Sequence, residues 1–569
     1  MTTKWLIALL LALGAGLAIA VAWHDRDMAV DDAYITFRYA DNLLAGHGLR
    51  WNPDSPPCEG YTNLSYVVGI ALLRACGLPP THAALGIAAF RIVVLVWLLW
   101  RAAAPAGRWA PAAAVPAVLL LGASELTVHA SRGLETVAFA ALAAAQLTAL
   151  ARLLASPLPR RRHAVATAAI ACLLFLTRPD GVLMSAAGFA ATAWLVRRDA
   201  PRRRTLALAI GLWLLGGAVY AAAKLAWFGY LLPNPFYMKA AVQGFAGIPE
   251  ITAFVTSHWL LLLLALAAVA GPLLVARVSP TAADERASLL ALAIAIPWLG
   301  YGAKIVHEIG FAHRFAWPLL PVLALATTRT LAAMAAPFTA TSPRLLPLLA
   351  WGALAAVLWL RGAQFEQQWR HLGEPRPHDP ITAAFLRFGD AIRDSGLGPQ
   401  LTLFCANAGA TPYAAGVHHV DPAGLVDDGY CLRTPAEERG RYQASQQFDV
   451  VAWNLFPASP GAATFDDDAR ARESEYLARF WRLDDDLDGA ARHGAAHRTV
   501  AERKADLFLP MYVLREHATL IGELRIGLPG SRLFVYVWKT SRWHDRLVEH
   551  LRQRVEIPPD AIDYAGKQR

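Results

Sequence analysis

The chain has 569 residues, of which 56% are hydrophobic and only 17% are charged, and its formal net charge is +9 at pH 7. Soluble domains usually carry about 25% charged residues, so this composition excludes an ordinary soluble protein and indicates an integral membrane protein. Many of the arginines stand between apolar segments. Membrane topology therefore explains the positive charge better than binding of nucleic acid does, and we expect no nucleic-acid partner.

The first apolar segment, Trp5–Trp23, is long enough to span a membrane. A cleaved signal peptide is the alternative, but the apolar core is longer than such peptides use, so we expect a retained helix. Leu64–Leu78 is apolar but shorter and contains Arg74, which predicts a helix lying on the membrane surface. With the first segment, ten more apolar segments predict eleven transmembrane helices: 83–100, 110–128, 134–154, 164–178, 181–196, 205–228, 251–278, 287–306, 314–335 and 343–361.

The arginines between these segments orient the predicted helices. If the N-terminus is cytoplasmic and the spans alternate, the strongest clusters fall in cytoplasmic loops, as the positive-inside rule requires. An odd number of spans then places the C-terminus on the outer side. The clusters are Arg101 with Arg108, Arg152 with Arg160, Arg161 and Arg162, and Arg197 and Arg198 with Arg202, Arg203 and Arg204.

Residues 362–569 differ in composition from the rest of the chain. They are polar, contain no segment that could span a membrane, and include near their start a Pro/Gly-rich stretch, "GEPRPHDP", that is typical of an entry linker. The runs "QLTLFCA", "FDVVAWN", "LFLPMYVL" and "RLFVYVWKT" are typical of strands. We therefore expect two domains: a transmembrane domain over 1–361, whose first outer loop is 24–82, and an extracytoplasmic mixed α/β domain over 362–569.

Five polar motifs fall on the predicted outer side, whereas the opposite loops are mainly arginine, alanine and proline. Ionisable groups at membrane depth are costly, so such an asymmetry indicates a functional site on the outer side. The motifs are "DDAYITFRYA", "SRGLET" (Ser131–Thr136), "TRPDG" (Thr177–Gly181), "LLPNPFYMKA" (Leu231–Ala240) and "HEIGFAHRFAWPLLP" (His307–Pro321).

Asp31 and Asp32 are adjacent, so on a helix their side chains diverge by about 100° and do not suit a dyad that shares one proton. One carboxylate suits a general base that takes the proton of a sugar hydroxyl, and the other suits binding of substrate or of a divalent metal. The alternative is helix capping, with Asp32 beginning a helix that runs through Phe37 and Tyr39. Capping explains one aspartate but not two.

The outer side also carries cations that suit a phosphate group. Arg178, Lys239, His313 and Arg314 are the predicted ligands of a donor phosphate, which they would stabilise as it leaves. The alternatives are snorkelling to the membrane surface and pairing with nearby carboxylates such as Asp180.

A further set of polar residues is predicted to bind substrate. Tyrosine and asparagine side chains suit hydrogen bonds to sugar hydroxyls, and Glu59 and Asn63 are placed to support the aspartate segment. For Glu135 the alternative is a favourable charge at a helix N-terminus. His418 and His419 resemble metal ligands but lack spaced partners. The predicted substrate-binding residues are Tyr34, Arg38, Glu59, Asn63, Glu135, Asn234 and Tyr237.

The sequence lacks, in a suitable context, the glycine-rich phosphate loop of ATPases, a dinucleotide-binding motif and the nucleophile elbow of serine hydrolases. An outer site also disfavours nucleotide sugars, which are cytoplasmic metabolites. A lipid-linked donor fits better, because its tail can lie between spans while its phosphate meets the outer cations.

The ordered motifs "DDAYITFRYADNLLAGHGLRWNP", "EGYTN", "SRGLET", "TRPDG", "LLPNPFYMK" and "HRFAWPLLP" resemble the membrane arabinofuranosyltransferases of the GT-C superfamily. These include enzymes that act on mycobacterial arabinan and on Gram-negative type IV pilin. The segment "LTLFCANAGATPYAAGVHHVDPAGLVDD" resembles the opening of that family's outer domain. Two places depart from the family pattern: Cys58 replaces an aliphatic residue, and "HEIGFAHRF" replaces a glycine- and aspartate-rich loop.

The resemblance implies a GT-C membrane domain in the bacterial cytoplasmic membrane and a carbohydrate-binding outer domain. It also implies a base at Asp31 or Asp32 and a decaprenyl- or undecaprenyl-phosphate sugar as donor. The expected reaction is an inverting transfer, most simply of D-arabinofuranose, to a glycan, a lipid-linked glycan or a pilin-like protein. Transfer of another lipid-linked sugar (mannose or aminoarabinose), a lipid-sugar flippase and a non-catalytic glycan-binding membrane protein remain as alternatives.

Overall fold

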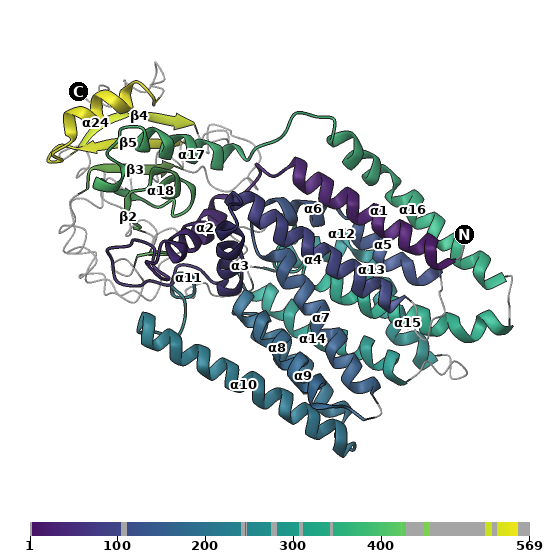
Figure 1. Ribbon diagram of the computed structural model, residues 1–569. Coiled ribbons are helices and arrows are strands. Elements are labelled where there is room, and N and C mark those ends of the chain that lie inside the picture. The colour runs from purple at the N-terminus through teal and green to yellow at the C-terminus, as the bar shows by residue number, and fades with distance from the viewer. Residues whose placement is uncertain are drawn as a thin grey trace. The chain divides into compact units, whose positions relative to one another are not determined.

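The computed structural model divides the chain into two compact units (Figure 1). Unit 1 comprises Met1–Ala29, Thr62–Leu231 and Gln243–His378, and unit 2 comprises Val30–Tyr61, Leu232–Val242 and Asp379–Arg569. The boundary expected after residue 361 remains a prediction. The described residues are 3–103, 111–156, 158–239, 245, 247–274, 282–305, 311–341, 345–422, 424–427, 448–455, 518–525 and 532–555.

Unit 1 is helical throughout its described residues, as the apolar periodicity predicts. Every apolar segment named above corresponds to one or more helices. They are α1 (Thr3–His24), α3 (Leu64–Ala75), α4 (Pro80–Ala102), η2 (Pro111–Ala114), α5 (Val115–Leu121), α6 (Ser124–Ser131), α7 (Thr136–Ala155), α8 (Arg161–Thr177), α9 (Gly181–Leu195), α10 (Ala200–Phe228), α12 (Ile248–Ser257), α13 (Trp259–Leu274), α14 (Ala282–Lys304), η3 (Phe311–His313), α15 (Leu319–Thr341) and α16 (Leu345–His371).

Five of the described helices are long and apolar enough to cross a membrane, namely α1, α4, α7, α10 and α14, or six if the bent pair α12 and α13 counts as one span. The predicted count of eleven is therefore not confirmed. One predicted span, 110–128, is broken into η2, α5 and α6. Another, 251–278, bends by 79° between α12 and α13. The surface helix expected over Leu64–Leu78 is α3, whose 12 residues are too short to span.

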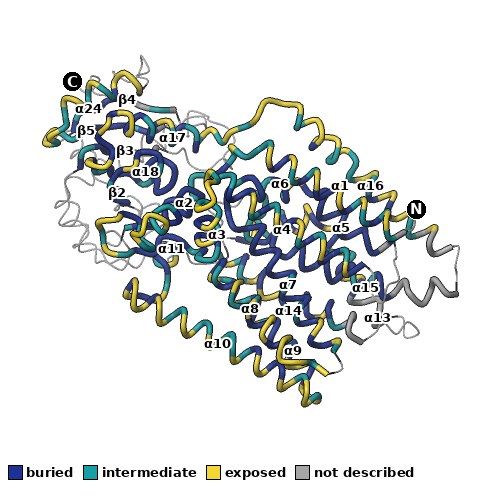
Figure 2. Tube along the Cα trace, in the orientation of Figure 1, coloured by how far each residue is buried: buried dark blue, intermediate teal, exposed yellow. Residues whose placement is uncertain are grey.

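Two of the long helices contrast in burial, although both are apolar. In α7, 83% of the most apolar stretch is buried, whereas in α10 only 11% is buried (Figure 2). Leu214, Leu215 and Val219 of α10 are each more than half exposed. Such a surface is unfavourable in water and favourable against lipid. We therefore assign α7 to the interior of unit 1 and α10 to its lipid-facing side.

The first and last helices of unit 1 end side by side. Their last residues are His24 in α1 and His371 in α16, and the two imidazole ring centres lie 4.9 Å apart. The two helices therefore run in the same direction (Figure 1). Successive membrane spans alternate in direction. If α1 and α16 both cross the membrane, the number of spans from α1 through α16 is therefore odd.

Unit 2 contains a mixed sheet with strand order β2-β1-β3-β5-β4. Strand β1 (Thr402–Cys405) pairs in parallel with β2 (His418–Val420) and β3 (Val450–Leu455). Strand β5 (Arg532–Trp538) pairs in antiparallel fashion with β3 and with β4 (Ala518–Arg525), which has a bulge between Leu520 and Gly522.

The mixed α/β architecture predicted for the C-terminal region is present in its described residues. Three of the four predicted strands are β1, β3 and β5, and the fourth, "LFLPMYVL", lies outside the described residues. The helices of this unit are α2 (Asp31–Leu44), α11 (Asn234–Lys239), α17 (Pro380–Arg393), η4 (Gly398–Gln400), α18 (Ala410–Ala415) and α24 (His544–Arg552).

Candidate active site

Helix α2 begins at Asp31, so both aspartates occupy its first turn. The preceding Val30 has extended backbone and supplies no side-chain cap. Carboxylates in this position are favoured by the partial positive charge at a helix N-terminus. The sequence predicted a helix here with Asp32 at its start, and the structure confirms the helix with its start one residue earlier. Both side chains are half-buried.

The carboxylate of Asp31 contacts a second helix of unit 2. Its Oδ1 accepts a hydrogen bond from the backbone N–H of Ala410, the first residue of α18, at 2.6 Å. Glycine at position 409 permits this approach, because a Cβ there would lie 1.9 Å from the Asp31 carbonyl oxygen. The start of α2 and the segment after β1 are thereby joined at Asp31.

The environment of Asp31 weakens its acidity. Burial raises its pKa from 3.8 to about 7, and the charges of Asp32 and Asp379 add to the rise, while the N–H groups of Ala410 and Gly409 oppose it. A carboxyl group with a pKa near neutrality is suited to accept a proton during a reaction at neutral pH. The geometry therefore favours Asp31 over an ordinary exposed aspartate as a base.

Arg38 is buried within unit 2, and its described contacts are structural. Its guanidinium donates to the carbonyl oxygens of Trp51, Pro412 and Val417 and to Oδ1 of Asn52, at 2.8–3.0 Å. It also lies over the Trp51 ring, 4.4 Å from the ring centre. Four of its five N–H groups are thus used, two to join α2 to the segment around α18 and two to hold the loop at Trp51 and Asn52. Its predicted role in substrate binding gains no support from this geometry.

His419 is likewise occupied within unit 2. Its Nδ1 accepts from the indole N–H of Trp51 at 2.9 Å, and its Nε2 donates to the carbonyl oxygen of Cys405 at 2.8 Å. Burial lowers the pKa of His419 to about 3, so the ring is neutral. Because both ring nitrogens have partners, the metal-binding interpretation of His418 and His419 gains no support.

Other predicted substrate residues of unit 2 form a buried layer. Asn234 donates from its backbone to the Glu59 carbonyl oxygen at 3.0 Å and from Nδ2 to Sγ of Cys58 at 2.9 Å. The Tyr34 ring packs edge-on against Tyr413. Tyr237 is half-buried in α11, and the side chain of Lys239, the last residue of α11, lies outside the described part of the chain.

Unit 1 holds a separate set of predicted site residues, centred on Glu135. Its Oε2 accepts from Asn63 Nδ2 at 3.1 Å, and its Oε1 accepts from Arg314 Nη2 at 3.2 Å. Arg178 Nη1 lies 3.8 Å from the same Oε1. We call Asn63, Glu135, Arg178 and Arg314 the Glu135 cluster. Residues from three predicted outer motifs and the start of α3 thus meet in one place.

The charges of this cluster are largely compensated. Arg178 also forms a two-pronged ion pair with Asp180, from Nε to Oδ1 at 3.0 Å and from Nη2 to Oδ2 at 2.6 Å. Burial raises the pKa of Glu135, but Arg314 and Arg178 outweigh it and hold the pKa below its usual value. Glu135 is therefore ionised, although only 2% of its surface is exposed.

Two arginine nitrogens in the cluster lack a hydrogen-bond acceptor. Arg178 Nη1 and Arg314 Nε are buried and have no hydrogen-bond acceptor among the described residues. Buried donors without acceptors are rare in native proteins. Water or an anionic ligand is the kind of acceptor that these nitrogens require.

The backbone beside Arg314 is strained. Ala312 and His313 have φ values of 49° and 57°, which residues other than glycine rarely adopt. The segment is fixed by His129, whose Nε2 bonds the Ala312 carbonyl oxygen at 2.9 Å, and by Glu250, which bonds His313 Nδ1 at 2.8 Å. Strain of this kind persists where the surroundings hold it, and it concentrates at functional sites.

An apolar pocket of about 370 Å³ lies in unit 1, and one of its lining residues, Thr177, directly precedes Arg178 of the Glu135 cluster. Two hydrogen bonds connect its lining residues to the motifs that supply the cluster: Tyr66 Oη to the Gly133 carbonyl oxygen at 3.3 Å, and Ser65 Oγ with Thr177 Oγ1 at 2.7 Å. The pocket is formed mainly by α3 and α4, and its lining includes Tyr66, Gly69, Leu73, Ile87, Phe90 and Thr177.

Sequence reasoning missed two residues that hold the strained segment, His129 and Glu250. His129 follows directly on predicted span 110–128, and an ionisable side chain at membrane depth is itself a signal. Glu250 carries no such signal in the sequence, since it stands just before an apolar segment where charge is common.

No protein-family model and no curated protein matches the chain. Among solved structures, ArnT from Cupriavidus metallidurans bound to undecaprenyl phosphate superposes with a TM-score of 0.55 at 13% identity, covering 80% of this chain and 94% of ArnT. The apo state of the same protein gives a TM-score of 0.52 at 14% identity, covering 80% and 93%. AglB from Archaeoglobus fulgidus gives 0.49 at 11% identity, covering 79% of this chain and 69% of AglB.

The likeness to ArnT extends over nearly the whole of that protein, so it concerns the complete architecture rather than one helical segment. It shows that this chain shares the fold of ArnT, in agreement with the expected fold class, and the long apolar helices support a multi-pass membrane protein.

Proposed function

We propose that this protein is a glycosyltransferase that takes a sugar from a polyprenyl-phosphate donor and transfers it to a glycan or protein acceptor outside the cytoplasmic membrane. One observation carries the proposal: in unit 1 Arg178 and Arg314 each have a buried nitrogen without a hydrogen-bond acceptor among the described residues, and Thr177, the residue directly before Arg178, lines an apolar pocket. A polyprenyl phosphate has the matching chemistry, because its phosphate accepts hydrogen bonds and its tail is purely apolar. The bound undecaprenyl phosphate of ArnT, which shares the fold, supports the same ligand class.

In this proposal Arg178 and Arg314 bind the donor phosphate. Phosphate oxygens accept hydrogen bonds from Arg178 Nη1 and Arg314 Nε, which have no acceptor among the described residues. Glu135 and Asp180 fix both guanidinium groups in orientation, so little reorganisation is needed when charge develops on the leaving phosphate. His313, also in unit 1, keeps its predicted role as a further cation of this site, and the role predicted for Lys239 in unit 2 stays a prediction.

The proposed reaction is a single displacement with inversion. An acceptor hydroxyl oxygen bonds to the anomeric carbon as the bond from that carbon to the phosphate oxygen breaks, and polyprenyl phosphate leaves. Asp31, or Asp32 beside it, takes the hydroxyl proton. The pKa of about 7 supports Asp31 as the first candidate, since such a carboxylate is a stronger base than an ordinary aspartate.

The sugar we propose first is D-arabinofuranose, on the motif resemblance described above. Mannose and aminoarabinose donors fit the same phosphate-and-tail chemistry. For the acceptor we propose a cell-envelope glycan, a lipid-linked glycan or a pilin-like protein, with the sheet-containing part of unit 2 assisting as a carbohydrate-binding region.

The test is a transfer assay with the full-length protein reconstituted in lipid. Wild type, Arg178→Gln and the double variant Asp31→Asn/Asp32→Asn each receive polyprenyl-phosphate arabinofuranose, mannose or aminoarabinose with a panel of glycan and peptide acceptors. We expect product from wild type with one donor and loss of product in both variants. Arg202→Gln, which changes an arginine paired with Asp199 at the N-terminus of α10, is the matched control and retains transfer.

Transport of intact donor between leaflets by wild type, without product from any donor, would replace the transferase proposal with a flippase. Donor binding that survives in all variants without transfer would instead favour a glycan-binding protein.

A further inference from the structure

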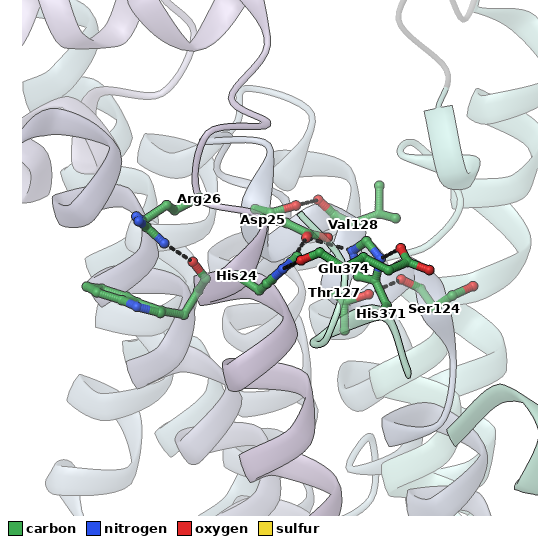
Figure 3. Close-up of polar contacts among 10 residues, drawn as sticks. His24, Asp25, Arg26, Ser124, Thr127, Val128, His371 and Glu374 are labelled. Atoms are coloured by element: carbon green, nitrogen blue, oxygen red, sulfur yellow. Dashed lines mark hydrogen bonds and ion pairs between the residues drawn. The ribbon is translucent and has the colours of Figure 1, made fainter. Parts of the chain in front are cut away.

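A cluster of metal-ligating side chains lies in unit 1, apart from the Glu135 cluster, where α1 and α16 end (Figure 3). It consists of His24, Asp25 and His371, with Glu374 just beyond α16. The ligand atoms of His24, Asp25 and His371 all lie within 4.8 Å of one another. We call these four residues the His24 cluster.

The hydrogen bonds set which ring nitrogen is available on each histidine. His24 Nε2 lies 3.0 Å from the Glu374 carbonyl oxygen, which only accepts, so this nitrogen carries the proton. His371 Nδ1 lies 2.7 Å from Glu374 Oε2, which fixes its proton in the same way. In the neutral rings, His24 Nδ1 and His371 Nε2 are therefore lone-pair atoms.

Both lone-pair nitrogens point at one oxygen. His24 Nδ1 lies 2.9 Å and His371 Nε2 lies 2.8 Å from Oδ1 of Asp25. Three electron-pair donors at this spacing repel one another unless a cation stands among them. The cation is either a proton on each ring or a metal ion that the three atoms share.

The arrangement has the features of a metal site. In such sites a histidine usually gives its other N–H to a carboxylate or a backbone carbonyl, which sets the tautomer and orients the ring. Glu374 serves both rings in this way, once with its carbonyl oxygen and once with its side chain. Two imidazoles and a carboxylate suit Zn²⁺ and its neighbours among divalent transition metals rather than Mg²⁺ or Ca²⁺.

Size and access also fit. Zn²⁺ bonds of about 2.0–2.2 Å place ligand atoms about 3.0–3.5 Å apart. Small rotations of the rings, which move their nitrogens by up to about 1 Å, bring the three ligand atoms to this spacing. The side chains of His24 and Asp25 are 11% and 17% exposed, whereas Glu374 is 61% exposed. The inner ligands are thus sheltered, while water has room to complete the coordination.

We propose that His24, Asp25 and His371 bind one Zn²⁺-like divalent ion, oriented by Glu374, and that the ion fastens the end of α1 to the end of α16. Because α1 and α16 are the first and last helices of unit 1, the ion closes the unit between elements 346 residues apart in sequence. Its role is to stabilise unit 1.

The experiment uses full-length protein without a polyhistidine tag, stripped with a chelator and titrated with Zn²⁺ or Co²⁺. Bound metal is counted by mass spectrometry, Co²⁺ coordination is followed by visible absorption, and thermal unfolding is recorded with and without Zn²⁺. His24→Gln and His371→Gln keep side chains of similar size that still form hydrogen bonds. His47→Gln, at an exposed position of unit 2, is the control.

We expect one equivalent of Zn²⁺ in wild type and His47→Gln, a Tm that rises on Zn²⁺ addition, and binding at least tenfold weaker in the two cluster variants. Glu374→Gln, which disturbs orientation alone, weakens binding about 10- to 100-fold. The stabilisation by Zn²⁺ grows from pH 6 to 8, because protons compete for the imidazole nitrogens.

The opposite pattern would overturn the proposal. The hydrogen bonds to Glu374 and Asp25 outweigh burial and raise the pKa of His371. If the shared cation is a proton, the stabilisation is full at low pH and is lost as pH rises past that pKa. Wild type would then bind no Zn²⁺, and its Tm would not respond to the metal.

Discussion

The Glu135 cluster of unit 1 and the Asp31 region of unit 2 shift the pKa of a carboxyl group in opposite directions. Glu135 is surrounded by Arg178, Arg314 and Asn63, and its pKa is held low. Asp31 has two N–H partners but also lies among other carboxylates, and its pKa rises to about 7. The first arrangement holds charges fixed, which suits the anion binding proposed above. The second creates a group that changes protonation at neutral pH, as proton transfer requires.

Removing the titratable group gives the largest expected effect. Asp31→Asn keeps the size and the hydrogen bond from Ala410 but cannot take a proton. We expect transfer to fall about 10²- to 10⁴-fold with donor affinity unchanged. Asp54→Asn, at an exposed position in the same unit, is the control. Transfer near the wild-type rate would show that Asp31 only joins two segments, with Asp32 as the remaining candidate base.

The next prediction tests whether the role of Arg38 is structural. Arg38→Lys loses most of the four hydrogen bonds and the stacking on Trp51. We expect a loss of about 2–4 kcal/mol in the stability of unit 2, since a buried charge loses its partners. Thermal unfolding and hydrogen exchange measure this loss. A stable variant whose acceptor KM rises would instead restore the predicted role in substrate binding.

Glycine 409 tests the contact that gives Asp31 its environment. Gly409→Ala places a methyl group 1.9 Å from the Asp31 carbonyl oxygen, so α2 and the start of α18 must separate. We expect unit 2 to lose about 1–3 kcal/mol of stability and transfer to fall with it. Gly217→Ala in α10, where nothing lies within 4 Å of the new methyl, is neutral or slightly stabilising.

The pocket beside the Glu135 cluster predicts a smaller effect. Gly86→Phe fills space facing Leu73, at a lining position outside the Glu135 cluster. We expect donor affinity to fall about tenfold, or ~1.4 kcal/mol, for a long polyprenyl chain. A soluble short-chain donor should bind equally to both forms. Equal losses for long and short donors would place the tail elsewhere.

The dependence of stability on pH tests the pKa of Asp31 itself. The pKa of Asp31 is higher in the folded than in the unfolded chain, so between about pH 4 and 7 the folded state binds more protons. This carboxyl group therefore makes the protein less stable as pH rises through that window, whereas transfer by the ionised base increases toward pH 7 and above. Asp31→Asn removes the contribution, and Tm values measured from pH 5 to 8 in both forms report it.

The sequence predicted where the helices lie much better than how many of them cross a membrane. Apolar runs identify helical segments because burial in protein and burial in lipid demand the same residues. They do not reveal breaks such as Gly122 between α5 and α6, or the 79° bend before Trp259, since neither makes the surrounding run less apolar. Likewise, β2 was missed because "HHV" is too short and too polar to give a strand pattern.

For the site, the motifs identified Glu135, Arg178 and Arg314 individually, and the structure brings them together within unit 1. Arg38 shows the limit of such reasoning. The sequence does not distinguish a buried arginine that binds three backbone carbonyls from one that binds a ligand, because every residue type has a backbone carbonyl. The His24 cluster was not foreseen at all, since its histidines are 347 positions apart.

One paired measurement tests the division between binding and proton transfer most directly. Donor affinity and the single-turnover transfer rate are determined for wild type, Arg178→Gln and Asp31→Asn in the same lipid. The account predicts that Arg178→Gln weakens donor binding at least tenfold, while Asp31→Asn binds donor normally and transfers at least 100-fold more slowly. Unchanged donor binding by Arg178→Gln, together with full transfer by Asp31→Asn, would contradict it.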